Sequence, residues 1–169
     1  MRIIKRKKPE RLGQGQAGFT LLELIITFAL IAILATIAVP SFQGIAANGN
    51  LKTAARDLAA DLANLRQSAI TSSRQNQLNL NLGANTYTLT RWTWNADGTG
   101  QFENQVKNLT AYANDISFNG TTDATTFVFF PRGTVTADGI QVVLSNGRTS
   151  TATIGINAAG RTSVSFNLK

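Results

Sequence analysis

The most constraining feature of the sequence is an apolar run of twenty-one residues from Phe19 to Val39, in which Glu23 is the single charged residue. A helix needs about 20 apolar residues to cross the hydrocarbon core of a bilayer, and so apolar a helix would be hard to bury inside a domain of this size. The rival interpretation is a cleaved secretory signal, whose apolar core is usually only about 7–15 residues long. Because this run is longer and a helical pattern continues beyond it, it predicts a membrane-spanning helix.

The positive charge of the chain is concentrated before this run. Residues 1–18 contain six basic residues and one acidic residue, a net charge of +5 that leaves only +2 of the chain's +7 for the remainder. The positive-inside rule then places the N-terminus in the cytoplasm and the residues after the span on the other side of the membrane. Since so little positive charge follows the span, the high pI is weak evidence for nucleic-acid binding.

The chain contains neither cysteine nor histidine. It therefore has no disulfide, no thiol nucleophile and no imidazole base, and it lacks the usual zinc ligands. Asp57 and Asp61 lie one helical turn apart and could form an acid–base pair. Their surroundings, with Lys52 and Arg56 close by, favour a solvated helix face instead. We expect no cofactor, no metal site and no enzymatic activity, which makes a membrane-anchored enzyme the least favoured function.

A second helical segment is expected between residues 40 and 76, as a continuation of the membrane span. Its apolar residues recur at spacings of three and four, so they form one stripe along a helix. The stripe consists of Leu51, Ala55, Leu58, Leu62, Leu65 and Ala69. Pro40 lacks the N–H of a helical hydrogen bond, and Gly44 and Gly49 each weaken a helix by roughly 1 kcal/mol relative to alanine. These three residues predict a helix kink.

From residue 77 to residue 169 the apolar residues alternate with a period of two, and short turn sequences separate the alternating segments. Short strands with tight turns predict an antiparallel sheet or sandwich, whose apolar face would pack on the helical stripe. In "YTLTRWTW", Tyr87 and Leu89 face one way and Trp92 the other. Packing of the tryptophan-bearing face in the core is the favoured interpretation, ahead of binding to single-stranded nucleic acid.

Glu23 needs its own explanation. Ionisable groups within membrane spans are rare and usually paired, which indicates a functional role. Alternatively, Glu23 lies near the membrane interface, where it is partly solvated and complements the positive end of the helix. The residues alone leave both interpretations open.

The N-terminal region resembles the class III signal of type IV pilins and type II secretion pseudopilins. The matching elements are a basic leader, "GFTLLE" at residues 18–23, the apolar run and Pro40. The remainder is similar to the FimT/GspH-type minor pilins in "LAADLANLRQSAITSSRQNQLNL", "FFPRGTV" and "IGINAAGRTSVS". The resemblance implies an α+β, pilin-like fold, in which a long N-terminal helix spans the membrane with its first half and packs on an antiparallel β-sheet or sandwich with its second.

The resemblance also implies a processing route. A prepilin peptidase would remove residues 1–18 by cutting between Gly18 and Phe19, and would methylate the new Phe19 amine. Glu23 would then pair with that amine, on its own or a neighbouring subunit, and set the register in a filament. Residues 19–39 would lie in inner-membrane lipid, with the N-terminus cytoplasmic and residues 77–169 periplasmic, until the protein assembles with other major and minor pilins.

Three functions follow from the resemblance. The leading one is a minor pilin, a structural component of the assembly or tip complex of a type IV pilus. The second is a GspH-type pseudopilin of a type II secretion system. The third is a DNA-binding minor pilin in natural transformation, because some FimT proteins bind DNA through a C-terminal G-R-x-R motif. Residues 160–163 keep only the first arginine of that motif, so Arg161 and Arg148 are the candidate DNA contacts.

Overall fold

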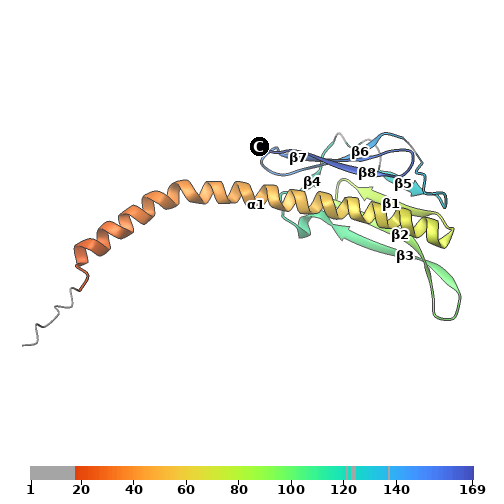
Figure 1. The fold of residues 1–169 in the computed structure, drawn as a ribbon, viewed down its shortest axis with the longest axis horizontal. Coiled ribbons are helices and arrows are strands. Elements are labelled where there is room, and N and C mark those ends of the chain that lie inside the picture. The colour runs from red at the N-terminus through yellow and green to blue at the C-terminus, as the bar shows by residue number, and fades with distance from the viewer. Residues whose placement is uncertain (1–17, 121, 123–124, 137) are drawn as a thin grey trace, which may run out of the picture. The chain divides into compact units, whose positions relative to one another are not determined.

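The structure is a computed structural model, and it describes residues 18–120, 122, 125–136 and 138–169. The leader predicted for residues 1–18 therefore lies outside the described residues, except for Gly18. The chain divides into two compact units, residues 1–40 and residues 41–169. Helix α1 (Leu21–Ser72) belongs to both of them (Figure 1).

In the first unit every described residue is exposed to solvent. The part of α1 in this unit belongs to a helix that is long and apolar enough to cross a membrane. It fits the predicted span, since apolar side chains that find no partner within the unit would be covered by lipid. Pro40, the last residue of this unit, lies inside α1.

The second unit begins with the C-terminal half of α1, whose predicted apolar stripe is confirmed. All six stripe residues are buried, at most 2% exposed, and Ala54 joins them. The helix ends at Ser72 and strand β1 starts at Asn76, so the helix is shorter than the segment predicted to reach residue 76. Ser73, which follows the helix, has a φ of 53°, and this left-handed conformation is a common way to end a helix.

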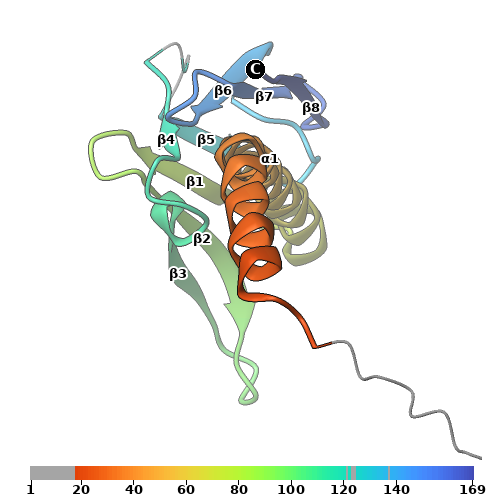
Figure 2. The ribbon, with the colours of Figure 1, turned by 90° about the vertical axis from the view of Figure 1, so that its left-hand side faces the viewer.

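The described residues of this unit form two four-stranded antiparallel sheets beside the C-terminal half of α1 (Figure 2). The first has the order β3-β2-β1-β5, with β1 (Asn76–Asn81), β2 (Thr86–Trp94), β3 (Gly100–Asn108) and β5 (Thr126–Phe129). The second has the order β4-β6-β7-β8, with β4 (Ser117–Phe118), β6 (Ile140–Ser145), β7 (Thr151–Ile156) and β8 (Thr162–Asn167). A short 3-10 helix, η1 (Leu109–Ala111), follows β3.

The hydrophobic core lies between the helical stripe and the inner faces of the sheets. Its largest fully buried side chains include Tyr87, Phe127 and Phe129. Among the described residues, none before Leu51 is buried. Residues 41–169 therefore contain the whole core of the described chain and can fold without the membrane span.

The face of β2 that packs in the core is not the one that was predicted. Tyr87 is fully buried and Leu89 is 5% exposed, so their face packs on α1. Trp92 and Trp94 lie on the opposite face, and Trp94 is 62% exposed. The prediction that the tryptophan-bearing face packs in the core is wrong, because the face with Tyr87 and Leu89 supplies the apolar contacts to the helix.

Candidate functional site

The start of α1 is fixed by a reciprocal capping box between Thr20 and Glu23. The Thr20 backbone N–H donates a 2.9 Å hydrogen bond to Glu23 Oε2, and the Glu23 N–H donates a 3.1 Å bond to Thr20 Oγ1. The Thr20 hydroxyl donates to the same Oε2 at 3.1 Å. A helix leaves its first N–H groups without partners, and a capping box satisfies two backbone donors there. Glu23 therefore has a structural role at the helix start.

The predicted partner of Glu23, the Phe19 amine, would form only on cleavage between Gly18 and Phe19. The Gly18–Phe19 peptide bond is intact, and Phe19 is 87% exposed. Among the described residues no hydrogen bond is made to Glu23 Oε1, since both side-chain bonds use Oε2. The pairing with the amine stays a prediction. The capping box was not predicted, although the spacing Thr20-x-x-Glu23 before an apolar run is its usual signature.

Pro40, Gly44 and Gly49 all lie within helix α1. The predicted kink at these residues stays a prediction, because it concerns the boundary between the two units. A Cβ added at Gly44 would lie 3.5 Å from Nη1 of Arg148. The turn between β6 and β7 therefore comes close to the helix at Gly44.

Asn48 attaches the same part of the helix to the end of the chain. Its side-chain amide donates a 3.1 Å hydrogen bond to the carbonyl of Lys169, and its Oδ1 accepts a 3.2 Å bond from Asn146. Asn146 belongs to the β6–β7 turn. Asn48 thus supplies a contact between the helix and the second sheet, next to Gly49, which weakens the helix.

The acidic pair on α1 is bound by two tyrosines. The Tyr87 hydroxyl and the Lys107 ammonium each donate a 2.8 Å hydrogen bond to Asp61, which is 9% exposed. The Tyr112 hydroxyl donates a 2.8 Å bond to Asp57. Burial raises the pKa of Tyr87, and the hydrogen bond to Asp61 raises it further. Burial, and to a smaller extent the hydrogen bond to Asp57, raises the pKa of Tyr112 to about 12. The expected solvated face is wrong for Asp61, whose carboxylate holds α1 against β2 and β3.

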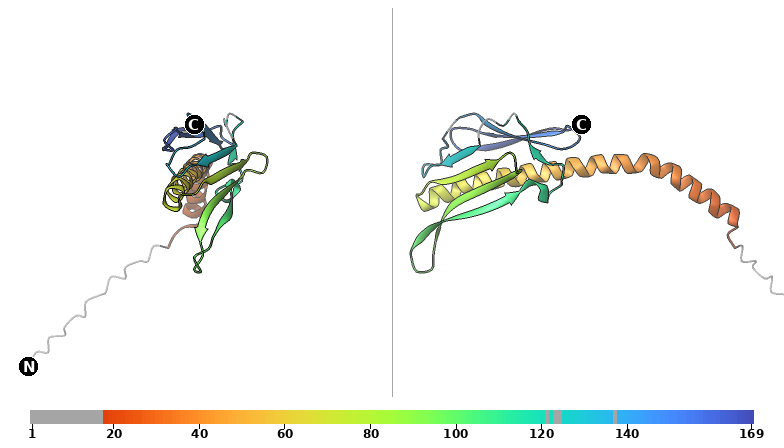
Figure 3. Two further views of the ribbon diagram at one scale, coloured as in Figure 1. Left: turned by 90° about the vertical axis from the view of Figure 1, so that its right-hand side faces the viewer. Right: turned by 180° about the vertical axis from the view of Figure 1, so that it is seen from behind.

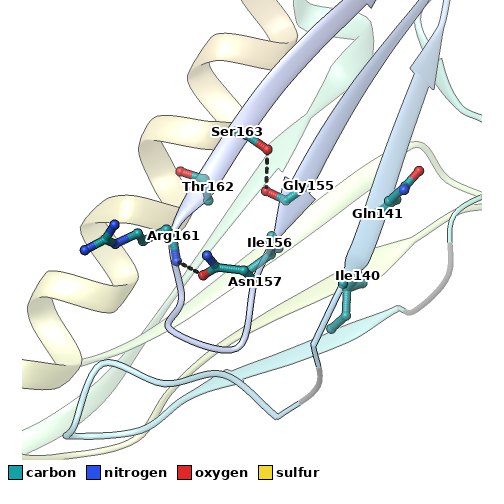
Figure 4. Close-up of a pocket in the computed structure, with 9 residues that line it drawn as sticks. Ile140, Gln141, Gly155, Ile156, Asn157, Arg161, Thr162 and Ser163 are labelled. Atoms are coloured by element: carbon teal, nitrogen blue, oxygen red, sulfur yellow. Dashed lines mark hydrogen bonds between the residues drawn. The ribbon is translucent and has the colours of Figure 1, made fainter.

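Arg148 and Arg161, the candidate DNA contacts, lie at opposite ends of strand β7. Arg148 precedes the strand and Arg161 follows it, and the six residues of β7 span about 20 Å. The two arginines therefore do not form one basic patch. The backbone N–H of Arg161 donates a 2.9 Å hydrogen bond to Asn157, and Figure 4 shows the guanidinium on the other side of the turn from Gln141.

Arg161 borders a shallow hollow of about 270 Å³ on the outer face of the second sheet (Figure 4). The hollow lies over Gly155, which has no side chain, between its register partners Gln141 and Ser163. Of the described residues that line it, Arg161 alone is charged. A single cation is a weak electrostatic attraction for a polyanion.

Arg66 of α1 connects two of the motifs that carry the family resemblance. Its Nε donates 3.0 Å hydrogen bonds to the carbonyls of Gly133, in "FFPRGTV", and Ala159, in "IGINAAGRTSVS". Gly133 and Gly160 have φ values of 79° and 67°, a region that favours glycine. A Cβ on Gly160 would collide with the Gly133 carbonyl oxygen. Arg66 itself lies in the third of the stretches that carry the resemblance, "LAADLANLRQSAITSSRQNQLNL", and its contacts with the other two were not predicted from the sequence.

The long apolar helix, the motif at its start and the antiparallel sheets packed on its second half define a pilin-like protein. Two family models match the chain, the prokaryotic N-terminal methylation motif at residues 13–39 and the type II transport protein GspH at residues 54–160. The second match covers more than half of the chain. The chain therefore belongs to the GspH family.

A solved structure with a similar fold is the minor pseudopilin EpsH from the type 2 secretion system of Vibrio cholerae. Its TM-score is 0.50 and its sequence identity 15%, and the match covers 70% of this chain and 97% of that chain. At this identity the likeness shows the fold. None of the curated proteins matches significantly.

These comparisons confirm the predicted fold class and family. The chain is a minor pilin or pseudopilin component of a type IV pilus-like system, and the family to which it belongs is one of structural, pilin-like components. The methylation motif implies processing by a prepilin peptidase and assembly with other pilins. The apolar helix fits an inner-membrane anchor for a periplasmic domain.

Proposed function

We propose that this chain enters a type IV pilus-like filament as a minor subunit, after a prepilin peptidase cuts between Gly18 and Phe19. The observation that carries this proposal is the methylation motif at residues 13–39, joined to a domain whose core is complete without the span. Before assembly the exposed apolar part of α1 would hold the subunit in the inner membrane. The domain would remain folded while the helix moves from lipid into the filament.

Glu23 would guide this assembly by pairing with the amine of Phe19, on the same or a neighbouring subunit. Cleavage creates a cation close to the capping box, and Oε1 of Glu23 is the oxygen to which the described residues donate no hydrogen bond. A carboxylate in an apolar environment is costly when it is unpaired. Subunits would therefore enter in the register that brings an amine to each Glu23.

The test separates this charge from the capping box. Glu23→Ala removes both, whereas Glu23→Gln keeps a side chain that can cap the helix but has no charge to pair with an amine. We expect the peptidase to cleave both variants and both to be reduced in purified filaments, as quantified by immunoblotting. Normal incorporation of Glu23→Gln beside a defective Glu23→Ala would show that capping, and not charge pairing, is the role of Glu23.

The leading candidate for the filament system is a type IV pilus, in which this chain would be a minor pilin of the assembly or tip complex. The second candidate is a pseudopilin of a type II secretion system, and the description of the matched family and the fold of EpsH favour it. Deletion of the gene in its own host separates them. Loss of surface pili with normal protein secretion supports the first, and loss of secretion with normal pili supports the second.

DNA binding is the third candidate, and it depends on Arg161. A gel-shift titration of residues 41–169 with duplex DNA, at low and at physiological salt, would test it. If Arg161 contacts DNA, the shift weakens in Arg161→Ala and not in Arg148→Ala, because the two arginines lie at opposite ends of β7. Absence of a shift at low salt would eliminate this role.

A further inference from the structure

The face of the first sheet that points away from α1 contains a cleft of about 380 Å³. This volume lies within the range of small-molecule sites, about 300–1,000 Å³. Its centre is a row of side chains in register across all four strands of the sheet. That row consists of Asn104 of β3, Thr90 of β2, Gln77 of β1 and Val128 of β5.

The polar groups of this row offer both donors and acceptors to a ligand. The Thr90 hydroxyl donates a 2.7 Å hydrogen bond to Asn104 Oδ1, which leaves the Asn104 amide N–H groups as donors. The Gln77 amide donates a 2.9 Å bond to Asn79 Oδ1, which leaves Gln77 Oε1 as an acceptor. None of the described residues that line the cleft is ionisable. A ligand hydroxyl donates one hydrogen bond and accepts two, so it matches such a set.

An aromatic surface continues from one end of the cleft. Phe102 lines the cleft and is 54% exposed, and its ring lies 5.0 Å from that of Trp92, its register partner on β2. Trp94 lies 5.7 Å from Trp92 and is 62% exposed. The Trp92 ring lies against Gly100, where a Cβ would collide with it. The loop that joins β2 to β3 stands clear of the helix (Figure 3).

We propose that this cleft and the aromatic surface bind a neutral oligosaccharide. A sugar ring presents hydroxyl groups at its edge and an apolar C–H face, and these match the amide and hydroxyl row and the exposed rings of Phe102 and Trp94. Aromatic side chains provide this kind of contact because they combine a large apolar area with a fixed orientation. The site depends neither on cleavage nor on assembly into a filament.

The charges and the strand order favour a sugar over two other ligands. A single-stranded nucleic acid needs a basic groove as well as aromatic rings. Arg91 points to the helix-facing side, 3.5 Å from Glu103. Arg74, whose guanidinium lies 5.0 Å from the centre of the Trp92 ring, adjoins the aromatic surface, but one cation does not make a basic groove. An extended peptide binds by adding a strand to a sheet edge. This cleft lies on the face of the sheet and crosses its four strands, so it presents side chains to a ligand and not the free backbone edge of β3.

The test uses residues 41–169 and two neutral probes, chitohexaose and maltohexaose. The chain's two tryptophans both lie on this face, so intrinsic fluorescence reports ligand binding at the site. We expect a saturable fluorescence change with at least one of the two sugars. If neither sugar gives a response at millimolar concentration, the proposal is overturned. It is overturned equally if the protein binds oligo(dT) in a salt-dependent manner and neither sugar.

Substitutions then locate the site by isothermal titration calorimetry. Phe102→Ala and Asn104→Ala should each weaken binding about fivefold or more. Val106→Ala is the matched control, because Val106 is 65% exposed on the same face of β3 but does not line the cleft. Thermal denaturation checks that each variant is folded. Unchanged affinity in Phe102→Ala and Asn104→Ala, or an equal loss in Val106→Ala, contradicts the proposed site.

Discussion

The Tyr87 hydroxyl donates a 2.8 Å hydrogen bond to Asp61, and this bond joins the start of β2 to helix α1. Lys107, the register partner of Tyr87 on β3, donates a 2.8 Å hydrogen bond to the same carboxylate. Three residues that are far apart in the sequence thereby fix the helix on the first sheet. A buried carboxylate with two such partners is costly to disrupt, because the partners lose their bonds as well.

Asp61→Ala should destabilise residues 41–169 by about 2–3 kcal/mol, since it leaves the Tyr87 hydroxyl buried without its acceptor and Lys107 without its counter-charge. Urea denaturation measures the change. Asp57→Ala is the matched control one turn away, and because Asp57 is exposed, its loss should cost less than about 1 kcal/mol. Equal losses in the two variants would contradict the structural role of Asp61.

Alkaline pH should weaken the domain through Tyr87. Burial and the bond to Asp61 raise the pKa of Tyr87 above its ordinary value, which is about 10. The contribution of Tyr87 is therefore complete below pH of about 10 and is lost above it, because only the unfolded chain then releases the proton. Between pH 10 and pH 11 the free energy of unfolding should fall by up to about 1.4 kcal/mol more in the wild type than in Tyr87→Phe. Parallel pH profiles would contradict this prediction.

Gly160→Ala should destabilise the domain more than Gly139→Ala does. Both glycines have positive φ, 67° and 70°, so both substitutions strain the backbone by about 1–2 kcal/mol. A Cβ at Gly160 also meets the Gly133 carbonyl and the Arg66 side chain, whereas no atom of the described residues lies within 4 Å of a Cβ at Gly139. Thermal denaturation of the two variants measures the difference. An equal loss of stability in the two variants would contradict the prediction, because the turns at Gly133 and Gly160 would then tolerate an added side chain.

The repeat of apolar residues predicted the helix and its buried face well. Leu58 and Leu62 are fully buried as expected, because a stripe of this width fits one buried face of a helix. The same reasoning could not choose between the two faces of β2. Alternation separates Tyr87 from Trp92 but carries no information on which side the helix packs, and this depends on contacts between distant residues.

The local and the distant contacts differ in how visible they are in the sequence. The Thr20–Glu23 capping box follows a known spacing, so it was predictable and was missed. The bonds of Asp61 to Tyr87 and Lys107 join residues that are 26 and 46 positions apart. No spacing rule covers such contacts, since they depend on the register of β2 and β3 against the helix.

The cleft on the first sheet likewise depends on strand register and could not be predicted from the sequence. Asn104, Thr90 and Gln77 come from three strands and become neighbours through the register of the sheet. In the sequence each is an ordinary polar residue of an alternating strand. The alternation of residues places Trp92 and Trp94 on one face of β2, but only the structure shows that this face points away from the helix.

The central claim is that this chain is processed and assembled as a pilin, and the N-terminus of the mature protein tests it most directly. Mass spectrometry of the protein purified from membranes of its own host should find a mature chain that begins with N-methylated Phe19. Gly18→Ala should leave the precursor uncut, with residues 1–18 still attached. A wild-type protein that keeps its leader, or a mature N-terminus at any residue other than Phe19, would contradict the account.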